Sequence, residues 1–231
     1  MPTVLLLRHG LTAMTGPVLA GRTPGVHLDE RGTAQATAAA DRLAVLPLAA
    51  VVTSPLERCA ETARAVTRAQ KAVGRTVRQR SDRRLLECDY GDWTGRSIET
   101  LAKDPLWPVV QQHPSAAVFP NGEAMSDMSA RAVATVRRWD DKISAEHGPD
   151  ALWLACSHGD VIKAILADAL GLHLDQFQRI VADPASISVI RYTPIRPFVV
   201  RVNEGGDLAS LVPPKAEAAA SDAAVGGGGG G

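Results

Sequence analysis

Arg8 and His9 have the clearest potential for chemistry in this sequence, because they stand at the end of a predicted strand. The apolar run 4–7 precedes them, and Gly10, which lets the backbone turn, follows. Four bulky aliphatic residues in succession are typical of a strand buried on both faces of an α/β sheet, and ligands of such sheets bind beyond the carboxyl ends of the strands. We therefore hypothesise that His9 is a nucleophile for a phosphoryl group whose charge Arg8 holds. For the tripeptide alone, an ordinary strand-to-loop junction is the alternative.

A second arginine, Arg58, follows a strand predicted at 49–53. Ser54 and Glu57 have the spacing of a capping box, with Pro55 between them, so we expect the next helix to begin at about Pro55. Arg58 then lies in the first turn, where free N–H groups favour an anion and the guanidinium adds two parallel donors. The alternative is an ion pair on a solvated helix face.

A second histidine, His158, follows the apolar run 151–156, and a helix is predicted behind it over about 160–170. It would bind a phosphoryl oxygen at the same edge of the sheet as His9. Because parallel strands direct their carboxyl ends to one edge, the three predicted strands would bring both histidines and both arginines together.

Glu87 is the predicted proton donor. It follows Leu85-Leu86 and precedes the Gly-rich segment 91–95, and a partly buried carboxyl there would have a raised pKa. Asp89 and Asp92 compete for this role, and a carboxylate that caps turn amides or pairs with a nearby arginine is the structural alternative.

These segments, in this order, resemble the histidine phosphatase superfamily, also called the phosphoglycerate mutase-like family, over residues 3 to 203. The resemblance implies an α/β fold, a three-layer α/β/α sandwich with a mostly parallel central sheet. It also implies that His9, Glu87 and His158 are catalytic and that Arg8 and Arg58 bind phosphate.

The loop 11–27 is expected to contact substrate, because it follows the catalytic strand directly. In the resembled family an asparagine six residues after the histidine helps to bind phosphate, but here that position is Thr15, and Leu11 stands where an acidic residue is frequent. A plain surface loop is the alternative for each single residue. The candidate substrate-binding residues in this loop are Thr15, Gly21, Arg22 and Thr23.

Composition narrows the function. Lysine plus arginine and aspartate plus glutamate both number 25, so no global basic field argues for nucleic acid. The three cysteines Cys59, Cys88 and Cys156 are widely spaced, which argues against a zinc site or a disulfide framework. No apolar stretch is long enough for a signal peptide or a membrane span. We expect a cytoplasmic enzyme that needs no metal or cofactor and has no membrane partner.

The chain reads as one α/β domain over residues 1–204, followed by an Ala/Gly-rich tail, 205–231, that we expect to be disordered. A helix capped by Asp29 is predicted over 30–45, an irregular lid over 104–120, and a late strand pair over 186–192 and 198–203. A stripe at helical spacing predicts a buried face on a long helix after Glu123; it consists of Met125, Met128, Ala132, Val136, Trp139 and Ile143.

The predicted function is a phosphatase that hydrolyses small phosphate monoesters through a phosphohistidine on His9, with a small phosphorylated metabolite as its partner. Phosphoglycerate mutase-type transfer is the enzyme alternative, but Leu11 and Thr15 depart from the fuller binding signature of a mutase. A noncatalytic phosphate-binding or regulatory protein on the same scaffold is the third possibility. The sequence leaves open whether the protein forms a homodimer.

Overall fold

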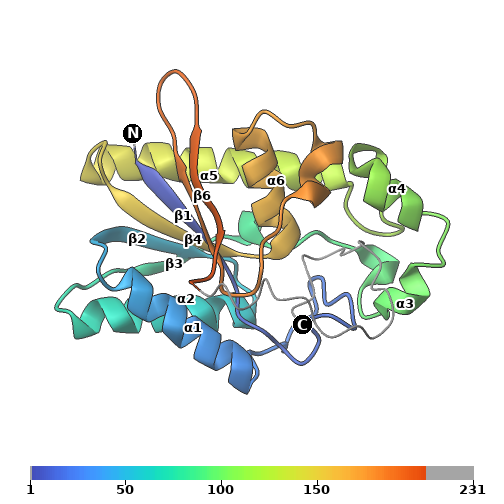
Figure 1. The fold of residues 1–231 in the computed structure, drawn as a ribbon, viewed down its shortest axis with the longest axis horizontal. Coiled ribbons are helices and arrows are strands. Elements are labelled where there is room, and N and C mark those ends of the chain that lie inside the picture. The colour runs from blue at the N-terminus through green and yellow to red at the C-terminus, as the bar shows by residue number, and fades with distance from the viewer. Residues whose placement is uncertain (1, 207–231) are drawn as a thin grey trace.

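The computed structural model describes residues 2–206, which form a six-stranded sheet with helices on both faces (Figure 1). The strand order is β3-β2-β4-β1-β5-β6. The strands β3, β2, β4 and β1 are parallel to one another. At the other edge β5 pairs antiparallel with β1, and β6 pairs antiparallel with β5. This confirms the predicted α/β sandwich with a mostly parallel sheet. The strands are β1 (Thr3–Arg8), β2 (Leu48–Thr53), β3 (Gln79–Ser81), β4 (Leu152–Ser157), β5 (Ile187–Arg191) and β6 (Phe198–Glu204).

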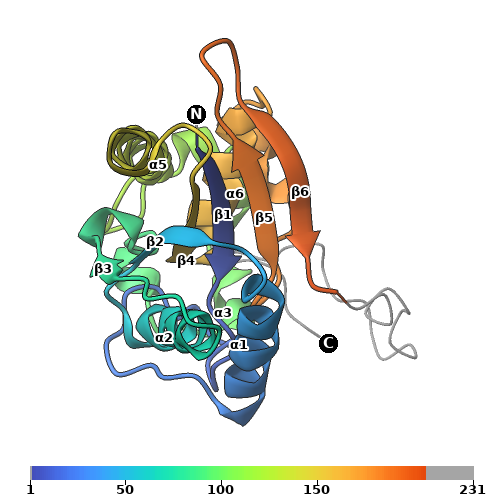
Figure 2. The ribbon, with the colours of Figure 1, turned by 90° about the vertical axis from the view of Figure 1, so that its left-hand side faces the viewer.

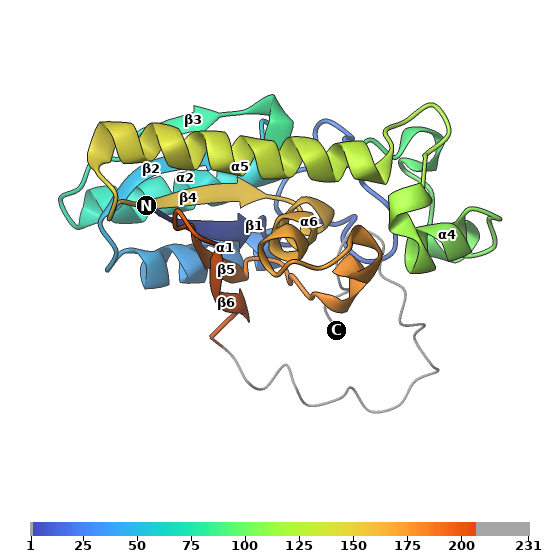
Figure 3. The ribbon, with the colours of Figure 1, turned by 90° about the horizontal axis from the view of Figure 1, so that it is seen from above.

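Two helical layers sandwich the sheet, as Figures 2 and 3 show from two sides: α1 and α2 cover one face, and α5 and α6 cover the other. The α-helices are α1 (Glu30–Leu43), α2 (Glu57–Ala72), α3 (Ile98–Leu101), α4 (Trp107–Gln112), α5 (Met125–His147) and α6 (Gly159–Ala169). Short 3-10 helices lie at Arg83–Leu85, Gly91–Trp93, Pro114–Ala116 and Leu174–Arg179.

The continuous apolar run of β1 follows from this double cover. Val4 and Leu6 belong to the core on the side of α5 and α6, whereas Leu5 and Leu7 belong to the core on the side of α1 and α2. Successive side chains of a strand point to opposite faces, so a strand covered on both sides needs apolar residues at every position.

The helical stripe predicted on α5 is buried as expected, and its six residues pack into the larger core. The Asp29 cap and the late strand pair are also confirmed. The expected lid over 104–120 is wrong in part, because this segment contains α4. Trp107 and Val110, three residues apart on that helix, are buried, and Trp107 packs against Trp93 with ring centroids 6.1 Å apart.

The helix after β2 begins at Glu57 and not at Pro55, and its N-cap residue Leu56 makes no side-chain capping bond. The predicted capping box is therefore absent. Oγ of Ser54 lies 2.8 Å from Nε2 of His158 and accepts from the amide of Leu56 at 3.5 Å, before the first turn of the helix.

In the range 2–206, no helix combines the length and the apolar character that a membrane crossing requires. The tail predicted at 205–231 lies outside the described residues except for Gly205 and Gly206.

Candidate active site

The carboxyl ends of β1, β2 and β4 lie side by side because β4 pairs with both other strands. His9, the segment that leads to Arg58, and His158 follow these three ends. The rings of His9 and His158 meet edge to face with their centroids 5.2 Å apart, and Nη2 of Arg58 lies 3.4 Å from Nδ1 of His158. Residues far apart in the sequence thus converge on one buried site, as the strand pattern predicts.

His9 is buried, and the carbonyl of Gly10 fixes its tautomer. Nδ1 lies 2.7 Å from that oxygen, which can only accept, so Nδ1 carries the proton and Nε2 keeps its lone pair. Burial lowers the pKa of His9 well below the ordinary value, and the charges of Arg58 and Arg8 lower it further. The imidazole is therefore neutral at physiological pH, which a nitrogen nucleophile requires.

The loop after His9 is held by close backbone packing against α1. A Cβ atom added to Gly32 would lie 1.9 Å from the carbonyl oxygen of Leu11, and one on Gly10 would lie 2.4 Å from the carbonyl oxygen of Gly32. The amide of Gly10 also donates to Oγ1 of Thr62 at 3.2 Å. Glycine is required at positions 10 and 32 because only hydrogen fits between the two backbones.

His158 is fully buried and is held at both ring nitrogens. Arg58 can only donate, so Nδ1 of His158 accepts from it, and Nε2 then carries the proton and donates to Oγ of Ser54 at 2.8 Å. Burial, followed by the charge of Arg58 and then that of Arg8, lowers the pKa of His158 well below its ordinary value. The site thus contains two neutral imidazoles beside two guanidiniums.

Both arginines are buried at this site. Nη2 of Arg58 donates to the carbonyl of Gly21 at 2.6 Å, whereas its Nη1 is buried and has no hydrogen-bond partner among residues 2–206. Nη1 of Arg8 donates to the carbonyl of Ala182 at 2.7 Å. A buried guanidinium nitrogen without a partner is costly, and a phosphoryl oxygen is an acceptor of the right charge for it.

Glu87 has the environment that a proton donor needs near neutral pH. Its side chain is buried, and burial together with the charge of Asp160 raises its pKa to about 7. The two other carboxylates considered for this role lie in different environments. Asp89 forms an ion pair with Arg22 at 3.1 Å, and Asp92 accepts a hydrogen bond from Asn121 at an exposed position. The geometry favours Glu87 over both.

The loop candidates divide into two groups. Gly21 and Arg22 contact the site: Gly21 accepts from Arg58, and Nε of Arg22 donates to the carbonyl of Glu87 at 2.8 Å. The hydroxyl of Thr15 instead bonds the amide and the hydroxyl of Thr12, both at 3.0 Å, and the amide of Thr23 donates to the carbonyl of Ala20. A role in substrate binding stays a prediction for all four, Thr15, Gly21, Arg22 and Thr23.

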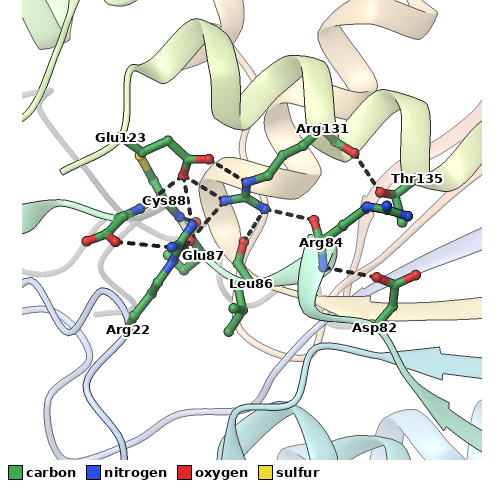
Figure 4. Close-up of polar contacts among 10 residues, drawn as sticks. Arg22, Asp82, Arg84, Leu86, Glu87, Cys88, Glu123, Arg131 and Thr135 are labelled. Atoms are coloured by element: carbon green, nitrogen blue, oxygen red, sulfur yellow. Dashed lines mark hydrogen bonds and ion pairs between the residues drawn. The ribbon is translucent and has the colours of Figure 1, made fainter.

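Three polar residues near the site, Asp160, Ser54 and Arg131, are not predicted as site residues from the sequence. Asp160 accepts from the hydroxyl of Tyr90 at 2.7 Å and lies two residues after His158, a position that could have marked it. For Ser54 the sequence predicts a helix cap. Arg131 has no signal in its spacing, because three of its acceptors are carbonyls of the segment 84–87 (Figure 4). Glu123, which pairs with it, belongs to the segment 121–123, where the resemblance implies contacts with substrate and simple helix capping is the alternative.

Comparisons with known proteins agree with this site. The bifunctional protein Rv2228c of Mycobacterium tuberculosis is 36% identical over 193 residues, which cover 82% of this chain and 50% of that protein. The chain thus spans about half the length of this relative. Phosphoserine phosphatase 1 of Hydrogenobacter thermophilus is 27% identical over 211 residues, covering 88% of this chain and 92% of that enzyme. Other relatives include a phosphoglycerate mutase by name.

The solved structures show the same fold. YhfR of Bacillus stearothermophilus superposes with a TM-score of 0.77 at 27% identity, over 88% of this chain and 98% of that one. The model of the histidine phosphatase superfamily (branch 1) matches residues 4–205, which is most of the chain and includes every candidate site residue. The chain therefore belongs to branch 1 of the histidine phosphatase superfamily.

Proposed function

We propose that this protein is a phosphatase that hydrolyses small phosphate monoesters through a phosphohistidine on His9. The observation that carries the proposal is the meeting of a neutral His9 with the buried Arg58, whose Nη1 has no partner among the described residues. A nucleophile with a free lone pair beside a buried guanidinium nitrogen that still needs an acceptor is suited to a phosphoryl group.

In the first step Nε2 of His9 attacks phosphorus, and the bond from phosphorus to the ester oxygen breaks. Glu87, which its raised pKa keeps protonated up to about pH 7, gives its proton to the departing alkoxide. Arg8 and Arg58 hold the phosphoryl oxygens while charge moves between the entering and leaving atoms, and His158 accepts a hydrogen bond from Arg58 and so keeps that guanidinium in place.

In the second step water attacks the phosphohistidine. Glu87, now ionised, takes the proton of that water, the bond between nitrogen and phosphorus breaks, and inorganic phosphate leaves. The starting state is thereby restored. A phosphoglycerate mutase differs only in its second acceptor, which is a hydroxyl of the substrate in place of water.

The support for a phosphatase over a mutase is the composition of the loop 11–27. Thr15 takes the place of the asparagine of the family pattern, and its hydroxyl is engaged by Thr12. The full-length similarity to phosphoserine phosphatase 1 also favours hydrolysis. We propose that the substrate is a small phosphorylated metabolite and that the enzyme works in the cytoplasm.

The test is phosphate release from p-nitrophenyl phosphate and from a panel of alkyl phosphate monoesters, with the His9→Ala variant as control. Interconversion of 2- and 3-phosphoglycerate is measured in parallel. We expect release that depends on His9, persists in EDTA and exceeds any interconversion. A wild-type protein inactive on the whole panel would contradict catalysis and favour a noncatalytic phosphate-binding protein. Complete loss of phosphate release in EDTA would instead indicate a metal-dependent mechanism.

A further inference from the structure

The segment that carries Glu87 is held by a single side chain from α5. Arg131 donates from Nη1 to the carbonyls of Arg84 and Leu86, at 2.7 Å each, and from Nη2 to the carbonyl of Glu87 at 3.0 Å (Figure 4). Three carbonyls within four residues therefore converge on one guanidinium. Glu87 itself lies outside the helices and strands, so these bonds take the place of regular secondary structure in fixing it.

Arg131 uses its full hydrogen-bonding capacity here. Besides the three carbonyls, it donates from Nε to Oε1 of Glu123 at 2.6 Å and from Nη2 to Oε2 of Glu123 at 2.9 Å. These bonds account for all five N–H donors of a guanidinium, and lysine, with three donors on a flexible stem, cannot reproduce them.

Glu123 joins Arg131 to a second arginine. Its Oε2 also accepts from Nη2 of Arg22 at 2.9 Å, and Nε of Arg22 reaches the same Glu87 carbonyl that Arg131 contacts. Burial alone would raise the pKa of Glu123, but the hydrogen bonds and charge of Arg131 lower it below the ordinary value. Glu123 is therefore an ionised bridge between two guanidiniums that hold one carbonyl.

We propose that Arg22, Glu123 and Arg131, which we call the Glu87 clamp, are positioning residues that place the proton donor against the leaving oxygen of the substrate. The proposal rests on the proposed function, because it takes Glu87 as the proton donor. It ties the loop 11–27 and helix α5 to the chemistry through the backbone carbonyl of Glu87, which both arginines contact.

A positioning role predicts a particular dependence on the substrate. An aryl phosphate releases a stable phenolate and needs little protonation, whereas an alkyl phosphate releases a basic alkoxide and depends on Glu87. A displaced proton donor therefore slows the alkyl ester selectively. A clamp that only stabilised the fold would slow both esters alike.

The experiment compares kcat/KM for p-nitrophenyl phosphate and glycerol 2-phosphate in wild type, Arg22→Lys, Glu123→Gln and Arg131→Lys. The matched control is Arg137→Lys, also on α5, whose guanidinium pairs with Asp168 at the surface. The same Arg22→Lys change is also made in a Glu87→Gln background, since coupled residues give non-additive effects. Thermal unfolding of every variant is recorded.

We expect the clamp variants to lose about tenfold to 100-fold in kcat/KM on the alkyl ester and much less on the aryl ester. The control keeps both rates, and in the Glu87→Gln background Arg22→Lys causes no further selective loss. An unchanged ratio of the two rates in the folded clamp variants would overturn the proposal. If Arg131→Lys does not fold, the ratio of the two rates in Arg22→Lys and Glu123→Gln tests the proposal. A wild type inactive on both esters refutes the proposed function itself, an outcome distinct from an unchanged ratio.

Discussion

The hydroxyl oxygen of Ser54 lies 2.8 Å from Nε2 of His158, and this contact joins the ends of β2 and β4 inside the site. Together with Arg58 at Nδ1, it leaves the imidazole of His158 only one tautomer. The ring is thus fixed before a phosphoryl group arrives.

Ser54→Ala should lower kcat/KM about tenfold, because a neutral hydrogen bond contributes about 1 kcal/mol and its loss leaves a buried N–H without an acceptor. The control is Ser188→Ala, which removes another buried hydroxyl, one that accepts from the amide of Asn203 at 3.0 Å on β6. Steady-state kinetics on one ester measures both variants. An active Ser54→Ala enzyme with the wild-type rate would mean that the contact is incidental.

The pH dependence should report the pKa of Glu87. Because burial and Asp160 raise it to about 7, Glu87 loses its proton as the pH rises through that value, and kcat/KM for an alkyl ester should fall there. Glu87→Gln should remove this decrease, the basic limb of the pH–rate profile, and should lower kcat/KM at pH 6 by about 100-fold or more. A basic limb that persists in Glu87→Gln would assign it to another group.

Stability should depend on the same group. The folded-state pKa of Glu87 lies above the ordinary 4.5, so its favourable contribution is complete below about pH 4.5 and is lost as the pH rises to about 7. Between these values Glu87→Gln should therefore gain stability relative to wild type. Urea unfolding at pH 5 and pH 8 measures the difference, and an equal difference at the two pH values would contradict the buried, neutral carboxyl.

Asp160→Asn should move the basic limb to lower pH. Asp160 accepts from Tyr90 and lies 3.6 Å from Nζ of the buried Lys163, and its negative charge is one cause of the raised pKa of Glu87. Loss of the partner of a buried cation should also cost stability, about 3 kcal/mol. Asp168→Asn, at the C-terminal end of the same helix and paired with Arg137, is the control. A basic limb that stays at the same pH in Asp160→Asn would contradict this explanation.

Gly32→Ala should destabilise the protein although alanine favours helices. The added Cβ would meet the carbonyl oxygen of Leu11 at 1.9 Å, and a backbone atom cannot move aside without displacing the loop after His9. We expect a loss of about 2 kcal/mol and lower activity. Gly205→Ala is the control, since a Cβ there meets no atom within 4 Å. A Gly32→Ala protein as stable as wild type would show that the loop can shift freely.

The sequence predicts well what is encoded locally. The apolar run before Arg8 and His9 and the one before His158 identify buried strands, and parallel pairing then requires their ends to meet. The burial of Glu87 is also predictable from the sequence, because this residue follows two apolar residues.

Interactions between distant segments were not predictable in this way. Arg22, Glu123 and Arg131 meet only after the loop 11–27 and α5 pack against the Glu87 segment. The role of Ser54 is not evident from the sequence, because a hydroxyl before Pro55 fits a helix cap as well as it fits a partner for a buried imidazole. The helix α4 is not predicted from the sequence, because the prolines of segment 104–120 favour an irregular structure and only two residues of the helix, Trp107 and Val110, are buried.

The central claim is that His9 carries the phosphoryl group. The most direct measurement is a rapid quench in alkali within a single turnover of a 32P-labelled ester, followed by peptide mapping. The account predicts an acid-labile, alkali-stable label on the peptide that contains His9, and no label in His9→Ala. Hydrolysis at the wild-type rate by His9→Ala, or a label on another residue, would contradict it.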